Sequence, residues 1–285
     1  MLAGMNQALE TSVVRVRGDV VTTTRDRVAI ERALQIRVRI GDDERVLSTT
    51  MRTPGDDVAL AVGFLHAEGV LGGATALRGA EQVGDDSVRV ELAPDAAAAL
   101  AASERTFVTS AACGVCGRAS LDGLDAGDGS RLPGDGARVT AAVIHRLPGA
   151  LRAAQATFDS TGGLHAAALF SLEGGLVAVH EDVGRHNAVD KLVGRLLLAG
   201  ELPLSNRVLM LSGRASFELV QKADAAGIPI VAAVGAPSSL AVERATAAGM
   251  TLLGFVRDGG FNVYCGAQRV AGVAGGAGLT GADAA

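Results

Sequence analysis

Two of the three cysteines in this 285-residue chain stand close together, in the segment Cys113-Gly114-Val115-Cys116-Gly117. Glycine on either side of a thiol lets the backbone turn sharply and gives a second molecule close access to the sulfur. A cysteine acts as a nucleophile only as its thiolate, and Arg118 directly after the pair favours that charged form. The spacing therefore predicts an exposed loop with a nucleophilic or sulfur-carrying thiol.

Three other chemistries are known for cysteines at this spacing. A structural zinc site closes with four ligands, and the sequence has no second Cys/His pair at the required spacing. A thioredoxin-like redox pair opens a helix after a strand, whereas an Asp- and Gly-rich stretch follows here. Zinc deaminases combine H-x-E with P-C-x-x-C; His66-Ala67-Glu68 offers the first element, but Ala112 replaces the proline of the second. These alternatives stay open, but the nucleophilic thiol is favoured and we expect no bound metal.

The composition favours a globular protein that binds neither nucleic acid nor membrane. Hydrophobic residues make up 48% of the chain, enough for a large core. The net charge is −5 and aromatic residues are only 3%, whereas a nucleic-acid surface needs a basic field and stacking rings. Residues 1–19 lack the apolar core of a signal peptide, and no run approaches the roughly 18 apolar residues that span a bilayer. We therefore expect a cytoplasmic protein, in which an odd number of cysteines argues against a disulfide framework.

The first half of the chain is typical of a small α+β domain that delivers the cysteine loop. Apolar residues alternate from Leu34 to Ile40, which predicts a half-buried strand. Thr53-Pro54-Gly55-Asp56-Asp57 predicts the start of a helix and Gly69 its end. We also expect a strand at 88–92, a helix at 96–102 and a strand at 106–109. The predicted boundaries are a tail at 1–20, this domain at 21–121 and a flexible connector at 122–138, because residues 122–136 are rich in Asp and Gly and lack periodicity.

The second half alternates apolar strands with helices. The expected strands are 164–170, 176–180, 208–211, 228–234 and 251–256, and the expected helices are 141–157 with a break at Pro148, 187 to Gly200, 217–226 and 238–248. Apolar strands that alternate with helices predict a largely parallel sheet covered on both faces. We place this α/β domain at 139–269 and a disordered tail at 270–285.

Polar clusters follow the ends of four of these strands, at 181–187, 212–216, 235–238 and 257–260. Ligands of open α/β sheets bind outside the carboxyl ends of the strands, so four such loops predict a binding site. The loops at 212 and 235 open helices with free backbone N–H groups, which suit an anion such as phosphate. Arg214 and Arg257 can add charge-assisted contacts, and His165 and His186 can orient a ligand or transfer a proton. Each loop alone is more typical of an ordinary helix cap, and each histidine alone is equally typical of a structural residue, but their coincidence predicts the ligand.

Several short motifs, taken in order, resemble the FdhD family of formate dehydrogenase accessory sulfurtransferases. They are Met51-Arg52-Thr53-Pro54-Gly55-Asp56-Asp57 with Gly63-Phe64-Leu65 and Glu68-Gly69, the segment Cys113 to Gly117, Thr161-Gly162-Gly163 with His165, Glu181 to Lys191, Ser212-Gly213-Arg214 with Ser216 and Glu218, Ala226-Gly227-Ile228-Pro229, and Gly254-Phe255 with Arg257 and Asn262. The resemblance extends from about Val28 to Tyr264. Two positions depart from the family pattern: Ala33 replaces a proline, and Gly235 replaces a serine close to the expected ligand contacts.

The resemblance implies a sulfur carrier. Such a protein accepts a persulfide sulfur from a cysteine desulfurase and transfers it to the molybdenum of a bound substrate, the bis(molybdopterin guanine dinucleotide) cofactor, which formate dehydrogenase needs. Cys113 is then the persulfide-bearing cysteine and Cys116 the second cysteine of the pair. The family's cofactor-binding stretch maps onto Phe255, Val256, Arg257, Asp258, Gly259 and Gly260, to which the polar loops add Ser212, Gly213, Arg214, His165 and His186.

The resemblance also has consequences for architecture. It implies a cytidine-deaminase-like, three-layer C-terminal domain without deaminase chemistry, a smaller N-terminal domain, and a homodimer. An alternative function stays open: a non-catalytic chaperone that shields the molybdenum cofactor and uses the cysteines only to dock it.

Overall fold

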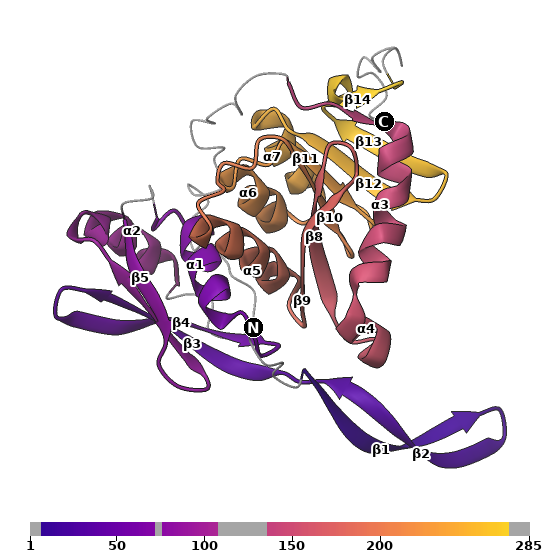
Figure 1. The fold of residues 1–285 in the computed structure, drawn as a ribbon, viewed down its shortest axis with the longest axis horizontal. Coiled ribbons are helices and arrows are strands. Elements are labelled where there is room, and N and C mark those ends of the chain that lie inside the picture. The colour runs from indigo at the N-terminus through magenta and orange to yellow at the C-terminus, as the bar shows by residue number, and fades with distance from the viewer. Residues whose placement is uncertain (1–6, 72–75, 108–135, 274–285) are drawn as a thin grey trace, which may run out of the picture.

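The computed structural model describes residues 7–71, 76–107 and 136–273 (Figure 1). They form two α/β domains, from which a β-hairpin projects. Cys113 and Cys116 lie outside the described residues, and so does most of the predicted connector. Within the described ranges, no helix is both long and apolar enough to cross a membrane.

The N-terminal domain is a four-stranded sheet packed against two helices. Its strands are β3 (Arg32–Ile40), β4 (Asp43–Arg52), β5 (Leu77–Gln82) and β6 (Ser87–Leu92), in the order β4-β3-β6-β5. Helices α1 (Asp57–Ala67) and α2 (Ala97–Phe107) follow β4 and the 3-10 turn Pro94–Ala96. The predicted alternation in β3 is confirmed, because Leu34, Ile36 and Val38 are buried against α1 while the residues between them are not.

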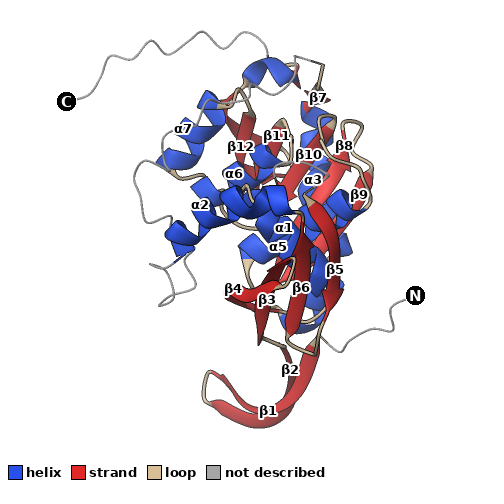
Figure 2. Cartoon of the chain, turned by 90° about the vertical axis from the view of Figure 1, so that its left-hand side faces the viewer, coloured by secondary structure: helices blue, strands red, loops and turns tan. Residues whose placement is uncertain are grey.

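Two segments near the ends of this half differ from our expectations. Residues 8–17, placed in an N-terminal tail, form strand β1 (Ala8–Arg17), which pairs with β2 (Val20–Ala29) in a hairpin that extends away from the body (Figure 1, Figure 2). The turn is made by Gly18 at φ 58°, and β-branched valines on both strands favour the extended backbone. Thr106 and Phe107, expected in a strand, continue α2, because the preceding alanine-rich sequence propagates the helix.

The C-terminal domain is built on a six-stranded sheet in the order β13-β12-β11-β10-β8-β9. The strands are β8 (His165–Ser171), β9 (Leu176–Asp182), β10 (Arg207–Leu211), β11 (Ile230–Ala233), β12 (Thr251–Arg257) and β13 (Gly260–Cys265). The parallel part is confined to β10, β11 and β12, while β8, β9 and β13 each run antiparallel to a neighbour. The α/β class is confirmed, and the sheet is mixed where we expected it to be largely parallel.

Helices cover this sheet on both faces, so the predicted three layers are present. Helices α5 (Arg185–Leu198), α6 (Phe217–Ala225) and α7 (Ser239–Ala247) lie on one face, and α3 (Ala141–Ala154) lies on the other (Figure 1). Successive residues of β10 alternate between the two cores: Leu209 and Leu211 pack under α5 and α6, Val208 and Met210 under α3. Two faces of buried residues explain why the strands are apolar throughout.

The ends of this domain hold more structure than we expected. Helix α3 runs through Pro148 without a break and is followed by the short helix α4 (Ala156–Thr161). Strand β13 and the turn Ala267–Arg269 follow β12, and β14 (Val270–Ala271) pairs in parallel with β7 (Val139–Thr140). The first residues of the expected disordered tail are thus hydrogen-bonded to the start of the domain.

Helices α1 and α5 join the two domains and meet backbone to backbone. A Cβ atom added at Gly63 would lie 1.9 Å from the carbonyl oxygen of Asp190, and one added at Gly194 would lie 1.9 Å from that of Ala59. Only glycine permits so close an approach. We call this contact, with the polar residues of 51–57 and with Asp182, Asn187, Asp190 and Lys191 around it, the junction.

Candidate functional site

The polar loops predicted from the sequence lie along one edge of the six-stranded sheet. Strand β9 runs antiparallel to β8, and β8 runs antiparallel to β10, so β9, β10, β11 and β12 all end at the same edge. The first residue of β8, His165, lies there too, opposite Asp182. We call this edge, with residues 162–165, 183–186, 212–218 and 234–238, the rim. The predicted site location is correct even though the sheet is mixed.

Hydrogen bonds tie the loops of the rim to one another. The Ser212 hydroxyl oxygen accepts the Ala166 N–H at 2.8 Å, and the N–H of Gly235 donates to the carbonyl of Gly213 at 2.9 Å. A Cβ atom at Gly235 would lie 3.0 Å from Cγ of Arg214, so the glycine that replaces the family's serine leaves room for the Arg214 side chain against the backbone. The loops therefore form one connected surface.

Two histidines and a glutamate set the electrostatics of the rim. His186 Nε2 lies 3.7 Å from a carboxylate oxygen of Glu218, and this neighbour is the main reason why the pKa of Glu218 falls to about 2. Burial, Arg185 and His186 all lower the pKa of His165, so this imidazole is neutral near pH 7. His165 also lies next to Gly213, where an added Cβ atom would be 3.5 Å from Nδ1.

Some polar atoms of the rim have no partner. Among the described residues, no group makes a hydrogen bond with Arg185 Nε, His186 Nε2 or Ser216 Oγ, although all three atoms are buried, and Glu218 approaches His186 Nε2 only to 3.7 Å. Buried polar atoms in folded proteins are almost always hydrogen-bonded. Atoms of this kind in a row of loops at a sheet edge are typical of a surface that is completed by a ligand.

The stretch from Phe255 to Gly260 is divided between the rim and a hairpin tip. Phe255 has φ 52°, a rare conformation for a bulky residue, and its N–H donates to the carbonyl of Gly235 at 3.1 Å. Its ring is 41% exposed while the neighbouring Val256 is buried. Arg257 pairs with Gly260 across the β12–β13 turn that contains Asp258 and Gly259. Phe255 thus lies at the rim, whereas residues 257–260 lie at the tip of the β12–β13 hairpin.

A cavity of about 560 Å³ opens beside the rim on the α3 side of the sheet. His165 and Ser212 line it together with residues that we did not predict. The added lining residues are Pro148, Leu151, Arg152, Gln155, Phe158, Gly162, Gly163, Leu164 and Val234. The volume lies in the range of small-molecule binding sites.

One wall of this cavity is held by Glu181, a residue of the family motif to which we had given no role. Its two carboxylate oxygens accept the N–H groups of Thr157 and Phe158 at 2.9 and 2.8 Å, the free donors in the first turn of α4. A carboxylate at a helix start is also favoured by the helix dipole. Glu181 therefore fixes α4, and with it Phe158, from the neighbouring strand β9.

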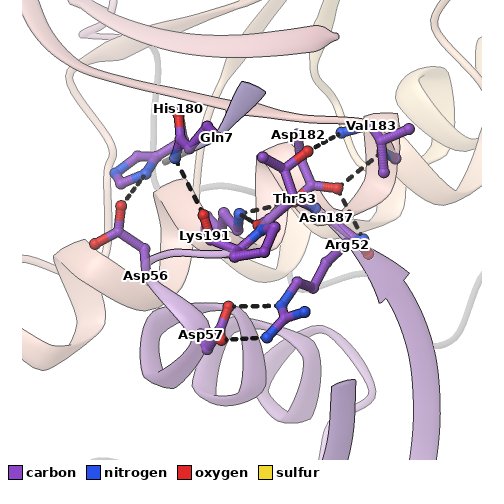
Figure 3. A network of polar contacts seen from close by, with 12 residues as sticks. Gln7, Arg52, Thr53, Asp56, Asp57, His180, Asp182, Val183, Asn187 and Lys191 are labelled. Atoms are coloured by element: carbon purple, nitrogen blue, oxygen red, sulfur yellow. Dashed lines mark hydrogen bonds and ion pairs between the residues drawn. The ribbon is translucent and has the colours of Figure 1, made fainter. Parts of the chain in front are cut away.

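The junction contains a fully buried charge with a complete set of partners, Asp182 (Figure 3). One carboxylate oxygen accepts from Lys191 Nζ at 2.7 Å and from the Thr53 N–H at 3.1 Å; the other accepts from the Gly184 N–H and the Asn187 amide. Lys191 Nζ also donates to the Thr53 carbonyl at 2.7 Å. This network holds the loop before α5 against the loop before α1.

Two further buried ion pairs stabilise the junction. Arg52 is fully buried and binds both carboxylate oxygens of Asp57, at 3.0 and 2.8 Å. Lys222 of α6 binds both oxygens of Asp190, at 2.7 and 2.9 Å; burial raises the pKa of Asp190 although the lysine opposes the shift. We had assigned no role to Asp190 or Lys191 of α5, although both lie in the motif from Glu181 to Lys191. The run of acidic and basic residues around that helix start was the signal for a second interface.

Of the three cysteines, only Cys265 lies in the described part of the chain, so the positions of Cys113 and Cys116 stay predictions. Cys265 is half-buried, and burial raises the pKa of its thiol, which disfavours the reactive thiolate. His66, part of the deaminase-like pattern, donates a 3.0 Å hydrogen bond from Nε2 to the carbonyl of Ala225 beside the junction. No three His, Cys, Asp or Glu side chains of the described ranges gather closely enough to hold a metal ion.

Comparison with known proteins gives one consistent set of matches. A family model described as FdhD/NarQ matches residues 29–271. The chain is 51% identical over 271 residues to a sulfur carrier protein FdhD of Streptomyces avermitilis, which covers 91% of this chain and 94% of that one. It is 42% identical to a protein of the same name from Sulfurisphaera tokodaii, with 93% and 99% covered. A crystal structure of a candidate formate dehydrogenase accessory protein from Desulfotalea psychrophila matches with a TM-score of 0.74 at 25% identity, covering 93% of this chain and 99% of the other.

Proposed function

The chain belongs to the FdhD/NarQ family, and we propose that it is a sulfur carrier that takes persulfide sulfur from a cysteine desulfurase and delivers it to the molybdenum cofactor of a formate dehydrogenase. We assign the persulfide to Cys113 and a supporting role to Cys116. The cargo-accepting substrate is the bis(molybdopterin guanine dinucleotide) form of the cofactor. The working protein is cytoplasmic and a homodimer in this proposal.

Loading of the carrier is a thiol exchange. The Cys113 thiolate attacks the outer sulfur of the donor persulfide, the donor's S–S bond breaks, and the donor cysteine leaves as a thiolate. A new S–S bond now joins Cys113 to the transferred sulfur, with no net change in oxidation state. Arg118 next to the pair favours the attacking thiolate.

Release can use the second cysteine. The Cys116 thiolate attacks the inner sulfur of the Cys113 persulfide, so that the outer sulfur leaves as hydrosulfide and the two cysteines end as a disulfide. The two electrons that reduce the sulfur come from this pair, and a dithiol reductant restores it. The hydrosulfide then passes to the molybdenum of the substrate.

The rim is the part of the described chain that suits the nucleotide ends of this substrate. The helix starts at 216–217 and 238–239 present backbone N–H groups, and the exposed Arg214 adds a cation for phosphate. The buried atoms of Arg185, His186 and Ser216 that lack a hydrogen-bond partner among the described residues lie along the same edge. The single observation that carries the proposal is this convergence of the family's motif residues on one rim of incompletely bonded polar groups.

A comparison of cysteine variants tests the proposal. After incubation with a cysteine desulfurase and cysteine, mass spectrometry should find 32 Da added at Cys113 in the wild type and none in Cys113→Ala, whereas Cys265→Ala, the matched control, should load normally. Activation of formate dehydrogenase should fall to background in Cys113→Ala. Cofactor binding without any transferable sulfur in the wild type, and full activation by Cys113→Ala, would instead identify the non-catalytic chaperone.

A further inference from the structure

The outer half of the β1–β2 hairpin carries an apolar face that lies in the open (Figure 1, Figure 2). Val14, Val16 and Val21 are 65%, 63% and 64% exposed. The register of the two strands sets Val16 opposite Val21 and Val14 opposite Thr23, so these four side chains lie on the same side of the hairpin. We call this uncharged group of four β-branched side chains the valine face.

The opposite side of the same half is charged. Arg15 and Arg17 alternate with Val14 and Val16 along β1, so their side chains lie on the other face of the strand. Arg15 Nη2 is 3.6 Å from a carboxylate oxygen of Asp26. Alternation of apolar and charged residues is typical of a strand with one buried and one solvated face. The sequence therefore indicates a cover over the valine face, which the described part of this single chain does not supply.

A hairpin that stayed uncovered would be a liability. Two strands without a partner layer are at best marginally stable in water. Soluble proteins usually protect such exposed strand edges with lysine or proline, and residues 8–29 contain neither. An exposed apolar surface bordered by polar residues is typical of a protein interaction site. The valine face is thus suited to binding another protein surface.

The base of the hairpin is bonded to both domains. Gln7, directly before β1, donates from Nε2 to the carbonyl of Pro54 at 3.2 Å, and its Oε1 accepts from the hydroxyl of Thr157 at 2.8 Å. The Ile30 N–H, directly after β2, donates to the Gln7 carbonyl at 2.9 Å. Pro54 belongs to the N-terminal domain and Thr157 to α4 of the other one. The hairpin is therefore a preformed arm, which loses little conformational entropy when it binds.

The size and charge of the hairpin favour a second copy of this chain as the partner. Its two strands of ten residues each approach the 20–30 residues that one side of a typical stable interface contributes. The four basic and three acidic residues of 8–29 nearly cancel, so the arm has no strong field to attract an oppositely charged protein. A transient partner would leave the valine face in water most of the time, whereas a second copy is present wherever the chain is. Apolar contacts of this kind are typical of permanent homodimers.

We propose that the β1–β2 hairpin is a dimerisation arm whose valine face is buried against a second copy of this chain. The inference rests on the homodimer of the proposed function and assigns the surface that forms it. In a dimer with two-fold symmetry each copy contributes one arm, so two valine faces leave water together.

Light scattering after size-exclusion chromatography of the full chain tests the proposal. The wild type should have twice the mass of one chain, and Val14→Glu combined with Val16→Glu should raise the dissociation constant of the dimer about hundredfold or more, because it places carboxylates in an apolar contact. Arg15→Glu combined with Arg17→Glu, on the opposite face of the same strand, is the matched control and should stay dimeric. All these side chains are exposed in the single chain, so circular dichroism should show the same fold throughout. A monomeric wild type, or a valine-face variant that stays dimeric, would overturn the proposal.

A second measurement uses the wild type alone. Hydrogen exchange of the backbone amides of residues 13–24 should become faster when the protein is diluted, because the arms separate; exchange that does not depend on concentration would contradict the proposal. If the valine-face variant stays dimeric but no longer binds a cysteine desulfurase, the face serves a different protein and the proposal is wrong.

Failure of this inference and failure of the proposed function give different results. Sulfur loading at Cys113 is measured by mass spectrometry on the same wild-type samples. A wild type that dimerises through the hairpin but accepts no sulfur contradicts the sulfur carrier alone. A monomer that loads normally contradicts the dimerisation arm alone.

Discussion

The junction and the rim both contain charged and polar residues near the start of helix α5, but they differ in how completely these residues are hydrogen-bonded. At the junction, Asp182, Lys191 and Asn187 are buried and each makes at least two polar contacts. At the rim, in the residues directly before Asn187, the buried atoms Arg185 Nε and His186 Nε2 have no hydrogen-bond partner among the described residues, and His186 Nε2 has only the longer 3.7 Å contact with Glu218. Motif residues of one helix start thus divide into a set that is satisfied by the protein and a set that is left incomplete.

This difference distinguishes polar residues that stabilise the fold from polar residues that bind a ligand. A buried charge with a complete set of partners contributes to architecture, and its removal leaves the partner uncompensated. A buried polar atom without a partner costs stability, so a function must justify it. Substitutions at the junction should therefore change stability first, and substitutions at the rim should change binding first.

The largest effect on stability is expected from Asp182→Ala. The change leaves the ammonium group of Lys191 buried and unpaired, which should lower the free energy of unfolding by about 3–5 kcal/mol. Urea denaturation followed by circular dichroism measures it. The double variant Asp182→Leu with Lys191→Met should recover much of the loss, because both charges are gone. If Asp182→Ala were as stable as the wild type, Asp182 would not have the architectural role that its contacts indicate.

A somewhat smaller loss is expected from Gly63→Ala. The added methyl group meets the backbone of Asp190 and must push α1 and α5 apart, at a cost of about 2–3 kcal/mol. Gly149→Ala in α3 is the matched control, because no atom lies within 4 Å of its added carbon, and it should raise stability slightly through the better helix propensity of alanine. Equal thermal midpoints for the two variants would contradict the close contact.

Replacement of a rim residue should show the reverse pattern. His165→Ala removes a half-buried neutral ring beside Gly213 and should cost less than about 1 kcal/mol of stability, near the centre of the range for point substitutions. Its affinity for guanosine diphosphate should nevertheless fall several-fold, as calorimetry can measure. A variant that unfolds at lower urea concentration but binds normally would place His165 with the junction residues.

The smallest effect is a pH dependence at the rim. Glu218 has its pKa lowered from 4.5 to about 2 by His186, so the pair adds stability above pH 4.5 that is lost as the pH falls from about 4.5 to about 2. Because the pair is partly exposed, the contribution is below about 1 kcal/mol. Urea denaturation across this pH window compares the wild type with Glu218→Gln. The free energies of unfolding of the two proteins should become equal at the acid end. Parallel pH profiles would show that the pair contributes nothing.

Sequence patterns predicted the rim better than the sheet that carries it. The ends of the apolar strands correctly predicted where the polar loops lie. This includes the loops after β9 and β10, although β8, which lies between these two strands, runs in the opposite direction. The short turn Glu173-Gly174-Gly175 pairs β8 with β9 as antiparallel neighbours, whereas the direction of β8 relative to β10 depends on the connection through α5, which the apolar pattern does not encode. The predicted location of the rim is therefore correct, although the prediction of a largely parallel sheet was wrong.

The junction and the cavity were harder to predict, because each depends on residues far apart in the chain. The helical spacing of α5 revealed the side that faces its own sheet but not the side that α1 covers. Gln155 lies inside the helix that we expected at 141–157, but in the structure it separates α3 from α4, whose first N–H groups are bonded by Glu181 on strand β9. Such long-range pairings are invisible to local periodicity.

The glycine contact between α1 and α5 has a consequence for motion. Where two helices touch through their main chains, no rotamer change can absorb a new crossing angle, and interlocked charges on either side resist sliding. Closure of one domain upon the other is thus not available as a way to bring distant groups together. A protein that bound the N-terminal sheet would therefore meet the rim of the other domain at a fixed distance and in a fixed orientation.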